Sequence, residues 1–131
     1  MRLRTFLDKL DDATITQAIH SAELDTTGKV RVFVSGRTLR KDDIIRRATR
    51  RFKKLGLTDS GTQPGILLYF LPLERRFAIL GGRDIHQHCG NEYWTELTCK
   101  IEEFLKRERF TEAVLHAVQE CGKLLALHFP R

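Results

Sequence analysis

Apolar residues recur at helical spacing in two segments of the first half of the chain, with a strand-like segment between them. Ile15, Ile19 and Ala22 form one stripe, which predicts a helix from about residue 11 to residue 23. Residues 29–35 alternate, with valine at every second position, which predicts a strand with one apolar face. A second helix should follow and end before Gly56. Its predicted apolar face consists of Ile44, Ile45, Ala48, Phe52 and Leu55.

The second half of the chain begins with an uninterrupted apolar run, residues 66–71. Such a run is typical of a strand that is covered on both faces. Residues 72–75 predict a turn, so that 76–80 returns as a third strand. Two helices are then expected, one over about 91–106 and one that Thr111 can cap. Their apolar stripes are Trp94, Leu97, Ile101 and Phe104 in the first and Val114, Ala117, Val118, Cys121, Leu124 and Leu125 in the second.

This order of elements predicts the fold class. The first two strands are joined through a helix, so they should run parallel, whereas the short turn makes the third strand antiparallel. We therefore expect an α/β fold, a three-layer α/β/α sandwich with a small mixed sheet and about four helices. The chain of 131 residues contains no internal repeat and no long linker, so residues 1–131 should form a single domain.

Composition and termini suggest an ordinary globular protein of the cytoplasm. Hydrophobic residues make up 41% of the chain and charged residues 31%, which argues against intrinsic disorder. Asp8 and Lys9 interrupt the basic N-terminus before an apolar stretch develops, so we expect no secretory signal. No apolar run approaches the ~20 residues that cross a bilayer, so we expect no transmembrane segment. The three cysteines have no paired spacing, which fits reduced thiols.

The predicted topology gathers acidic residues at one edge of the sheet. Parallel strands begin at the same edge and the antiparallel strand ends there, so the loops 23–28, 58–64 and 81–84 should meet. Carboxylates and hydroxyls that converge from several loops suit a hard cation. We predict a Ca²⁺ or Mg²⁺ site, or a surface for a protein partner, at this edge. The proposed metal ligands are Glu23, Asp25, Asp59 and Asp84, accompanied by the hydroxyls of Thr26, Thr27, Thr58 and Ser60. Ordinary solvated loop residues are the alternative interpretation.

A basic run in the second predicted helix is the strongest charge feature of a chain whose net charge is +6. One interpretation is contact with the phosphates of nucleic acid or with an anionic membrane. The other, which the run by itself favours, is a solvated helix face, because no exposed aromatic residues alternate with the cations. The residues of this basic patch are Arg46, Arg47, Arg50, Arg51, Lys53 and Lys54.

Sequence motifs for other chemistry are missing. His86, His88 and Cys89 offer at most three zinc ligands, and no second ligand pair has suitable spacing, so a zinc site is not expected. The chain has no Gly-x-Ser-x-Gly, no phosphate-binding Gly-x-x-x-x-Gly-Lys-Ser/Thr and no Cys-x-x-Cys. A covalent catalytic mechanism therefore has no sequence support.

A series of short segments carries a resemblance that covers almost the entire chain. They are Ala18-Ile19-His20-Ser21-Ala22-Glu23, Thr27-Gly28-Lys29-Val30-Arg31-Val32, Gly65-Ile66-Leu67-Leu68-Tyr69, Phe77-Ala78-Ile79-Leu80-Gly81, Ile85-His86, Gly90-Asn91-Glu92-Tyr93-Trp94 and His128-Phe129-Pro130. No segment is specific alone, but in this order and at this spacing they resemble the TPM domain family.

The resemblance implies a three-layer α/β domain of undefined biochemical role. Similar domains occur in thylakoid-lumen proteins of photosystem repair and in many bacterial proteins, often attached to membrane segments. Divalent-metal binding and phosphatase activity are associated with some members, so the resemblance adds a metal-assisted phosphatase to the candidate functions. The chain departs from the family pattern at Gly82, where Asp is common, and at Gln63-Pro64, where Arg-Asn is usual.

Overall fold

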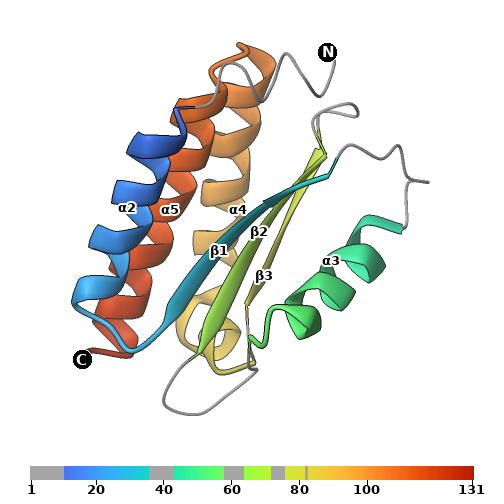
Figure 1. Ribbon diagram of the computed structural model, residues 1–131. Coiled ribbons are helices and arrows are strands. Elements are labelled where there is room, and N and C mark those ends of the chain that lie inside the picture. Colours follow the sequence, from blue (N-terminus) through green and yellow to red (C-terminus); the bar gives the residue numbers. More distant parts are fainter. Residues whose placement is uncertain (1–10, 36–42, 58–63, 72–75, 82) are drawn as a thin grey trace.

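Helices and strands follow one another in the order that the sequence predicts (Figure 1). The computed structural model describes residues 11–35, 43–57, 64–71, 76–81 and 83–131, with the side chains of the last range described from Trp94 onward. Within these residues the elements are α2 (Asp12–Leu24), β1 (Lys29–Val34), α3 (Asp43–Lys54), β2 (Gly65–Leu71), β3 (Arg76–Gly81), α4 (Arg83–Lys106) and α5 (Phe110–His128).

The sheet has the predicted mixed topology, with strand order β1-β2-β3. β1 runs parallel to β2, with Lys29 opposite Gly65. β3 runs antiparallel to β2, with Ile66 opposite Gly81. Every residue of the central strand β2 is buried, which confirms a strand covered on both faces.

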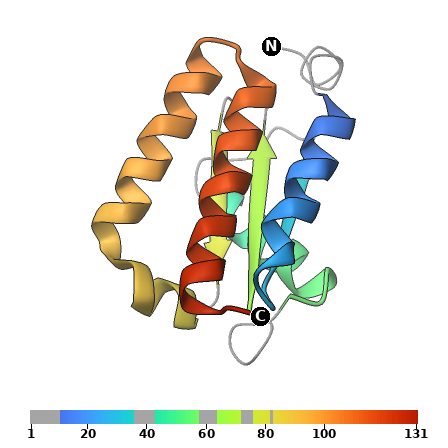
Figure 2. The same cartoon turned by 90° about the vertical axis from the view of Figure 1, so that its left-hand side faces the viewer.

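Two apolar cores hold the three layers together and confirm the α/β/α sandwich. On one face α2, α4 and α5 cover the sheet, and α5 lies between the other two helices (Figure 2). Among the described elements, α3 alone covers the opposite face (Figure 1), and its Ile44, Ala48 and Phe52 pack in one core with side chains of β2 and β3. The alternation of side chains along each strand divides the sheet between the two cores.

The apolar face predicted for α3 is partly wrong. Ile44, Ala48 and Phe52 are buried as expected, but Ile45 is 55% exposed and Leu55 is 42% exposed. Ile44, Ala48 and Phe52 are spaced four residues apart and form a single stripe, which is enough to cover the narrow sheet. Ile45 lies to one side of that stripe and Leu55 follows the end of the helix.

The predicted starts of the last two helices also need correction. α4 begins at Arg83, well before residue 91, because its first two turns carry polar residues and Gly90 and therefore show no apolar stripe. α5 begins at Phe110, and its N-cap residue Arg109 makes no side-chain capping hydrogen bond. Thr111 does not cap this helix; its Oγ1 accepts a hydrogen bond from the backbone N–H of Asp11, at 3.1 Å.

Candidate functional site

The edge of the sheet where β1 and β2 begin and β3 ends is called the loop edge below. The strand pairings confirm its topology, because Lys29 pairs with Gly65 and Ile66 with Gly81. The C-terminus of the chain reaches the same edge (Figure 2), and Thr26 forms an isolated bridge with Pro130 there. Sequence reasoning did not anticipate this fourth segment, because a single bridge between residues so distant in the chain leaves no local pattern.

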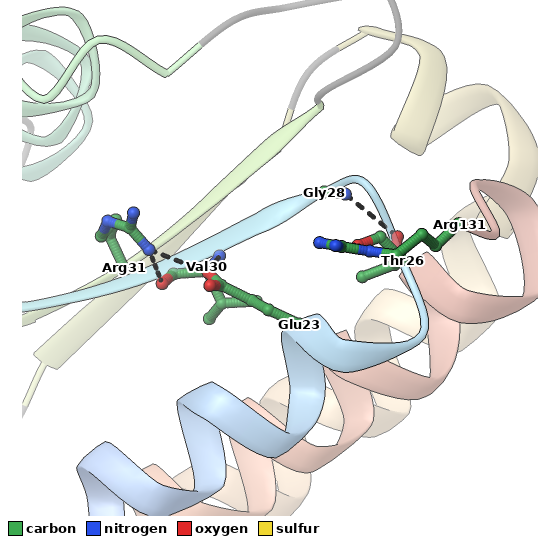
Figure 3. A network of polar contacts seen from close by, with 6 residues as sticks. All are labelled: Glu23, Thr26, Gly28, Val30, Arg31 and Arg131. Carbon is green, nitrogen blue, oxygen red and sulfur yellow. Dashed lines mark hydrogen bonds and ion pairs between the residues drawn. The ribbon is translucent and has the colours of Figure 1, made fainter.

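Glu23, one of the predicted metal ligands, already has partners within the chain. Its Oε1 accepts hydrogen bonds from the backbone N–H of Val30, at 2.9 Å, and from Nη1 of Arg31, at 2.8 Å. Figure 3 shows the two charged side chains pointing toward one another at the start of β1. Both are only partly exposed, so Arg31 neutralises much of the charge that Glu23 would offer a cation.

The other predicted ligands are less fully described. Asp25 follows the end of α2 and its side chain is exposed. Asp59 lies outside the described residues, and Asp84 lies in the first turn of α4, where side chains are not described. Among the described side chains, no three His, Cys, Asp or Glu residues are close enough to hold a metal ion. Glu23 and Asp25 alone do not provide the six to eight oxygens of a Ca²⁺ site.

Thr26 has a structural role that the sequence did not reveal. Its side chain is fully buried, and its hydroxyl donates to the carbonyl of Phe129. The carbonyl oxygen of Leu125 also lies within hydrogen-bond distance of this hydroxyl, at 3.1 Å. The hydroxyl oxygen of Thr26 accepts from the backbone N–H of Gly28, at 3.0 Å. The predicted availability of this hydroxyl to a cation is therefore wrong. Buried polar groups need hydrogen-bond partners, and the hydroxyl of Thr26 finds them at the end of α5. The hydroxyl thereby connects the loop before β1 to the end of α5.

Arg131 completes the contact between the loop edge and the C-terminus. Its backbone N–H donates to the carbonyl of Asp25, at 3.1 Å, and its guanidinium group lies 3.4 Å from the carbonyl of Thr26 (Figure 3). A hollow of about 260 Å³ beside this contact is lined by Glu23, Thr27 and Gly28 together with the cations Lys29 and Arg131. The described part of the loop edge therefore carries charges of both signs.

A second concave surface lies between α3 and the open side of β1 and is called the basic groove below. α3 packs mainly over β3 and β2, so it leaves the face of β1 beside it only partly covered. The resulting cavity measures about 340 Å³. Its lining includes Phe33 and Tyr69 from the sheet and Arg47, Arg50, Arg51 and Lys54 from α3.

Aromatic rings form part of the wall of the basic groove. Phe33 stacks on Tyr69 with ring centroids 5.4 Å apart, and the guanidinium carbon of Arg51 lies 4.1 Å from the Phe33 centroid. No exposed aromatic residues alternate with the cations within the helix itself, so the sequence pattern of the helix gives no sign of this wall. Phe33 of β1 and Tyr69 of β2 supply the rings across the groove, and only the packing of α3 on the sheet brings them there.

Only some residues of the predicted basic patch line the basic groove. Arg47, Arg50, Arg51 and Lys54 line the cavity at spacings of three, four and seven residues, which place them along one side of the helix. Arg46 and Lys53 are exposed and are not part of its lining. Helical spacing alone places Arg46, Arg50 and Lys53 on a common face, and of these three only Arg50 lines the cavity.

The fold defines the class as a small three-layer α/β domain, and two comparisons with known proteins extend this result. The chain belongs to the TPM domain family, because the model of that domain matches residues 2–124. Among solved structures it is similar to the BA42 protein of the psychrophilic bacterium Bizionia argentinensis, determined by NMR. The TM-score is 0.78 at 26% identity, over 90% of this chain and 80% of that chain. No curated protein matches it.

No helix in the part of the chain that the structure describes is long and apolar enough to cross a bilayer.

Proposed function

We propose that this TPM domain binds a divalent cation, Ca²⁺ or Mg²⁺, at the loop edge. The observation that carries the proposal is the strand pairing. Gly65 pairs with Lys29 and Gly81 with Ile66, so the starts of β1 and β2 and the end of β3 lie at one end of the sheet. In the sequence, Asp25 precedes β1, Asp59 precedes β2 and Asp84 follows β3, and a hard cation is bound by oxygen ligands of this kind.

Glu23 and Asp25 have different roles in this proposal. The ion pair with Arg31 and the bond from the backbone of Val30 make Glu23 mainly a structural residue. Asp25 is exposed, so it can reach a cation without giving up such partners. We therefore expect Asp25, Asp59 and Asp84 to provide most of the affinity and Glu23 to contribute little.

Titration with Ca²⁺ and then Mg²⁺, followed by amide NMR, tests this proposal. We expect saturable shifts at Asp25, Asp59 and Asp84 at submillimolar to millimolar ion, the range of weak Ca²⁺ modules. Asp25→Asn should weaken binding about tenfold, because it removes one charged oxygen ligand. Asp12→Asn is the matched control, since it removes the same charge from an exposed residue at the other end of α2. If none of the three aspartates shifts, or both variants weaken binding equally, the cation site is refuted.

A more specific version of this proposal is that the bound cation supports phosphatase activity. A bound cation would polarise a phosphoryl oxygen of the substrate, so activity would require the same loop-edge residues. Hydrolysis of a generic phosphomonoester should depend on the added cation and fall in Asp84→Ala. Activity that survives Asp84→Ala unchanged would contradict the assignment to this edge.

A protein partner is the other occupant that we propose for the loop edge. The described residues that line the hollow beside Arg131 include the carboxylate of Glu23 and the cations Lys29 and Arg131, which suits a polar segment with charges of both signs. Ion-independent amide shifts at Thr27, Gly28 and Lys29 on addition of a partner would identify this function. Shifts confined to other surfaces would contradict it.

A further inference from the structure

Four cations converge on the basic groove, and its described lining residues include no carboxylate. Arg47 and Arg51 are half-buried, whereas Arg50 and Lys54 are exposed. Within the described part of the chain, none of the four forms an ion pair. Holding four like charges around one cavity is unfavourable without an anion, because their repulsion increases as water is excluded.

The aromatic wall orients one of these cations. The guanidinium group of Arg51 lies over the ring of Phe33, where a cation–π contact is favourable. A stacked guanidinium keeps its N–H groups available at its edge, where they can donate to an anion in the same plane. Arg51 is thus held in place before any ligand arrives, which lowers the entropic cost of binding.

The size and chemistry of the cavity select the kind of anion. A volume of about 340 Å³ lies at the lower end of the range for small-molecule sites and leaves room for a phosphate with a small organic group attached. Arginine donors match the tetrahedral oxygens of phosphate in pairs, and a terminal phosphate carries a charge of about −1.5 to −2 at neutral pH. Phe33 offers an apolar surface for the attached group.

We propose that the basic groove binds the terminal phosphate of a small phosphorylated group, through Arg47, Arg50, Arg51 and Lys54. The phosphate could belong to a free nucleotide or to the headgroup of a phosphoinositide lipid, which present the same chemistry. This site lies on the opposite side of the sheet from α2, α4 and α5 and is independent of the proposed cation site at the loop edge (Figure 1).

Two binding measurements on the intact chain distinguish the sources. The first is calorimetric titration with AMP, and the second is co-sedimentation with phosphatidylcholine vesicles that contain a phosphoinositide. Binding in either measurement supports the site if it depends on the groove, and it identifies the source. We expect Arg47→Gln/Lys54→Gln to weaken the binding that is found by about tenfold or more, because two charge-assisted contacts are lost.

Arg46→Gln/Lys53→Gln is the matched control. It removes the same net charge from the same helix, but at two exposed positions outside the groove, so we expect less than a twofold change. Arg47→Lys/Arg50→Lys keeps the charge and removes the paired donors, and should weaken binding several-fold. Circular dichroism of each variant establishes that it is folded.

Three results would overturn the proposal. One is an equal loss of affinity in the groove variant and its control, which would indicate non-specific electrostatic attraction, as nucleic acid would also show. Another is unchanged binding in Arg47→Lys/Arg50→Lys, since a phosphate held by paired donors requires arginine. The third is the absence of binding to both AMP and phosphoinositide vesicles at low salt, where electrostatic attraction is strongest.

Discussion

At the scale of single residues, the hydrogen bonds of Asp11 show how one side chain fixes the start of a helix. Asp11 is the N-cap of α2, and its carboxylate accepts from the backbone N–H of Thr14, at 3.1 Å. The Thr14 hydroxyl, followed by this backbone N–H, lowers the pKa of Asp11. The folded protein therefore binds a proton at Asp11 less readily than the unfolded chain does.

This shift predicts a pH-dependent contribution to stability. The contribution is complete above the ordinary carboxyl pKa and is lost as the pH falls through the lowered pKa of the folded state. Asp11→Ala should therefore destabilise the protein at neutral pH and have less effect in strong acid. Asp11→Asn keeps a good capping group and should remove only the pH dependence. Urea unfolding of the three proteins across acidic pH measures this, and parallel pH profiles for wild type and Asp11→Asn would contradict it.

Thr26 gives a second prediction at this scale. Thr26→Val keeps the shape of the side chain but leaves the buried N–H of Gly28 and carbonyl of Phe129 without the hydroxyl. We expect a loss of about 1–3 kcal/mol in the free energy of unfolding, measured in urea. Thr27→Val is the control, because Thr27 is only half-buried and its hydroxyl has no hydrogen bond among the described contacts. Equal losses in both variants would contradict the assigned role.

At the scale of elements, the contact between α2 and α5 depends on a glycine. A Cβ atom at Gly122 would lie 2.7 Å from Cβ of Ala22 and 3.0 Å from its Cα, closer than such atoms pack. The small residues at both positions let the two helices approach closely on the same face of the sheet. The sequence did not reveal the role of Gly122, because a glycine adds nothing to the apolar stripe from which the buried face of α5 is predicted.

Gly122→Ala should therefore destabilise the protein despite the better helix propensity of alanine. Propensity favours alanine by about 1 kcal/mol, but the forced separation of two packed helices costs about 1–3 kcal/mol. Combining it with Ala22→Gly removes the Cβ–Cβ contact and should recover part of the loss, beyond the sum of the single effects. Thermal unfolding of the wild type, the two single variants and the double variant gives the complete double-mutant cycle. A stabilising Gly122→Ala would show that the helices separate without cost.

At the scale of the whole molecule, the C-terminal residues are joined at the loop edge to the segment between α2 and β1. The carbonyl of Phe129 accepts from the hydroxyl of Thr26 and from the backbone N–H of Thr27, at 3.3 Å in the latter case. β1 is an edge strand, so this contact helps to hold its beginning in place, together with the pairing with β2 and the bonds from Val30 and Arg31 to Glu23.

Removal of residues 129–131 should therefore loosen the start of β1 more than the rest of the sheet. We expect faster amide hydrogen exchange at Gly28 and Lys29 and a loss of about 2 kcal/mol or more in stability, since buried groups lose their partners. Arg131→Ala is the control and should have a small effect, because its side chain makes only long contacts of 3.4 Å. Unchanged exchange at β1 in the shortened chain would contradict this role of the C-terminus.

The sequence by itself determined the order of elements, the mixed sheet and its two covered faces. These follow from local periodicity and from connection lengths, because spacing of apolar residues specifies which side of each element is buried. Local periodicity does not reveal the start of α4, because the first turns of this helix are polar. It also does not reveal that Ile45 is exposed, because that exposure depends on the width of the sheet beneath α3.

Only the tertiary structure decided what the charged and polar residues do. It paired Glu23 with Arg31, buried Thr26 against the end of α5, and brought Phe33 of β1 beside four cations of α3. These contacts join residues that lie on different elements, and no pattern within one element specifies them. Their distances depend on how the layers pack, so the chemistry of the loop edge and of the basic groove became visible only in the folded chain.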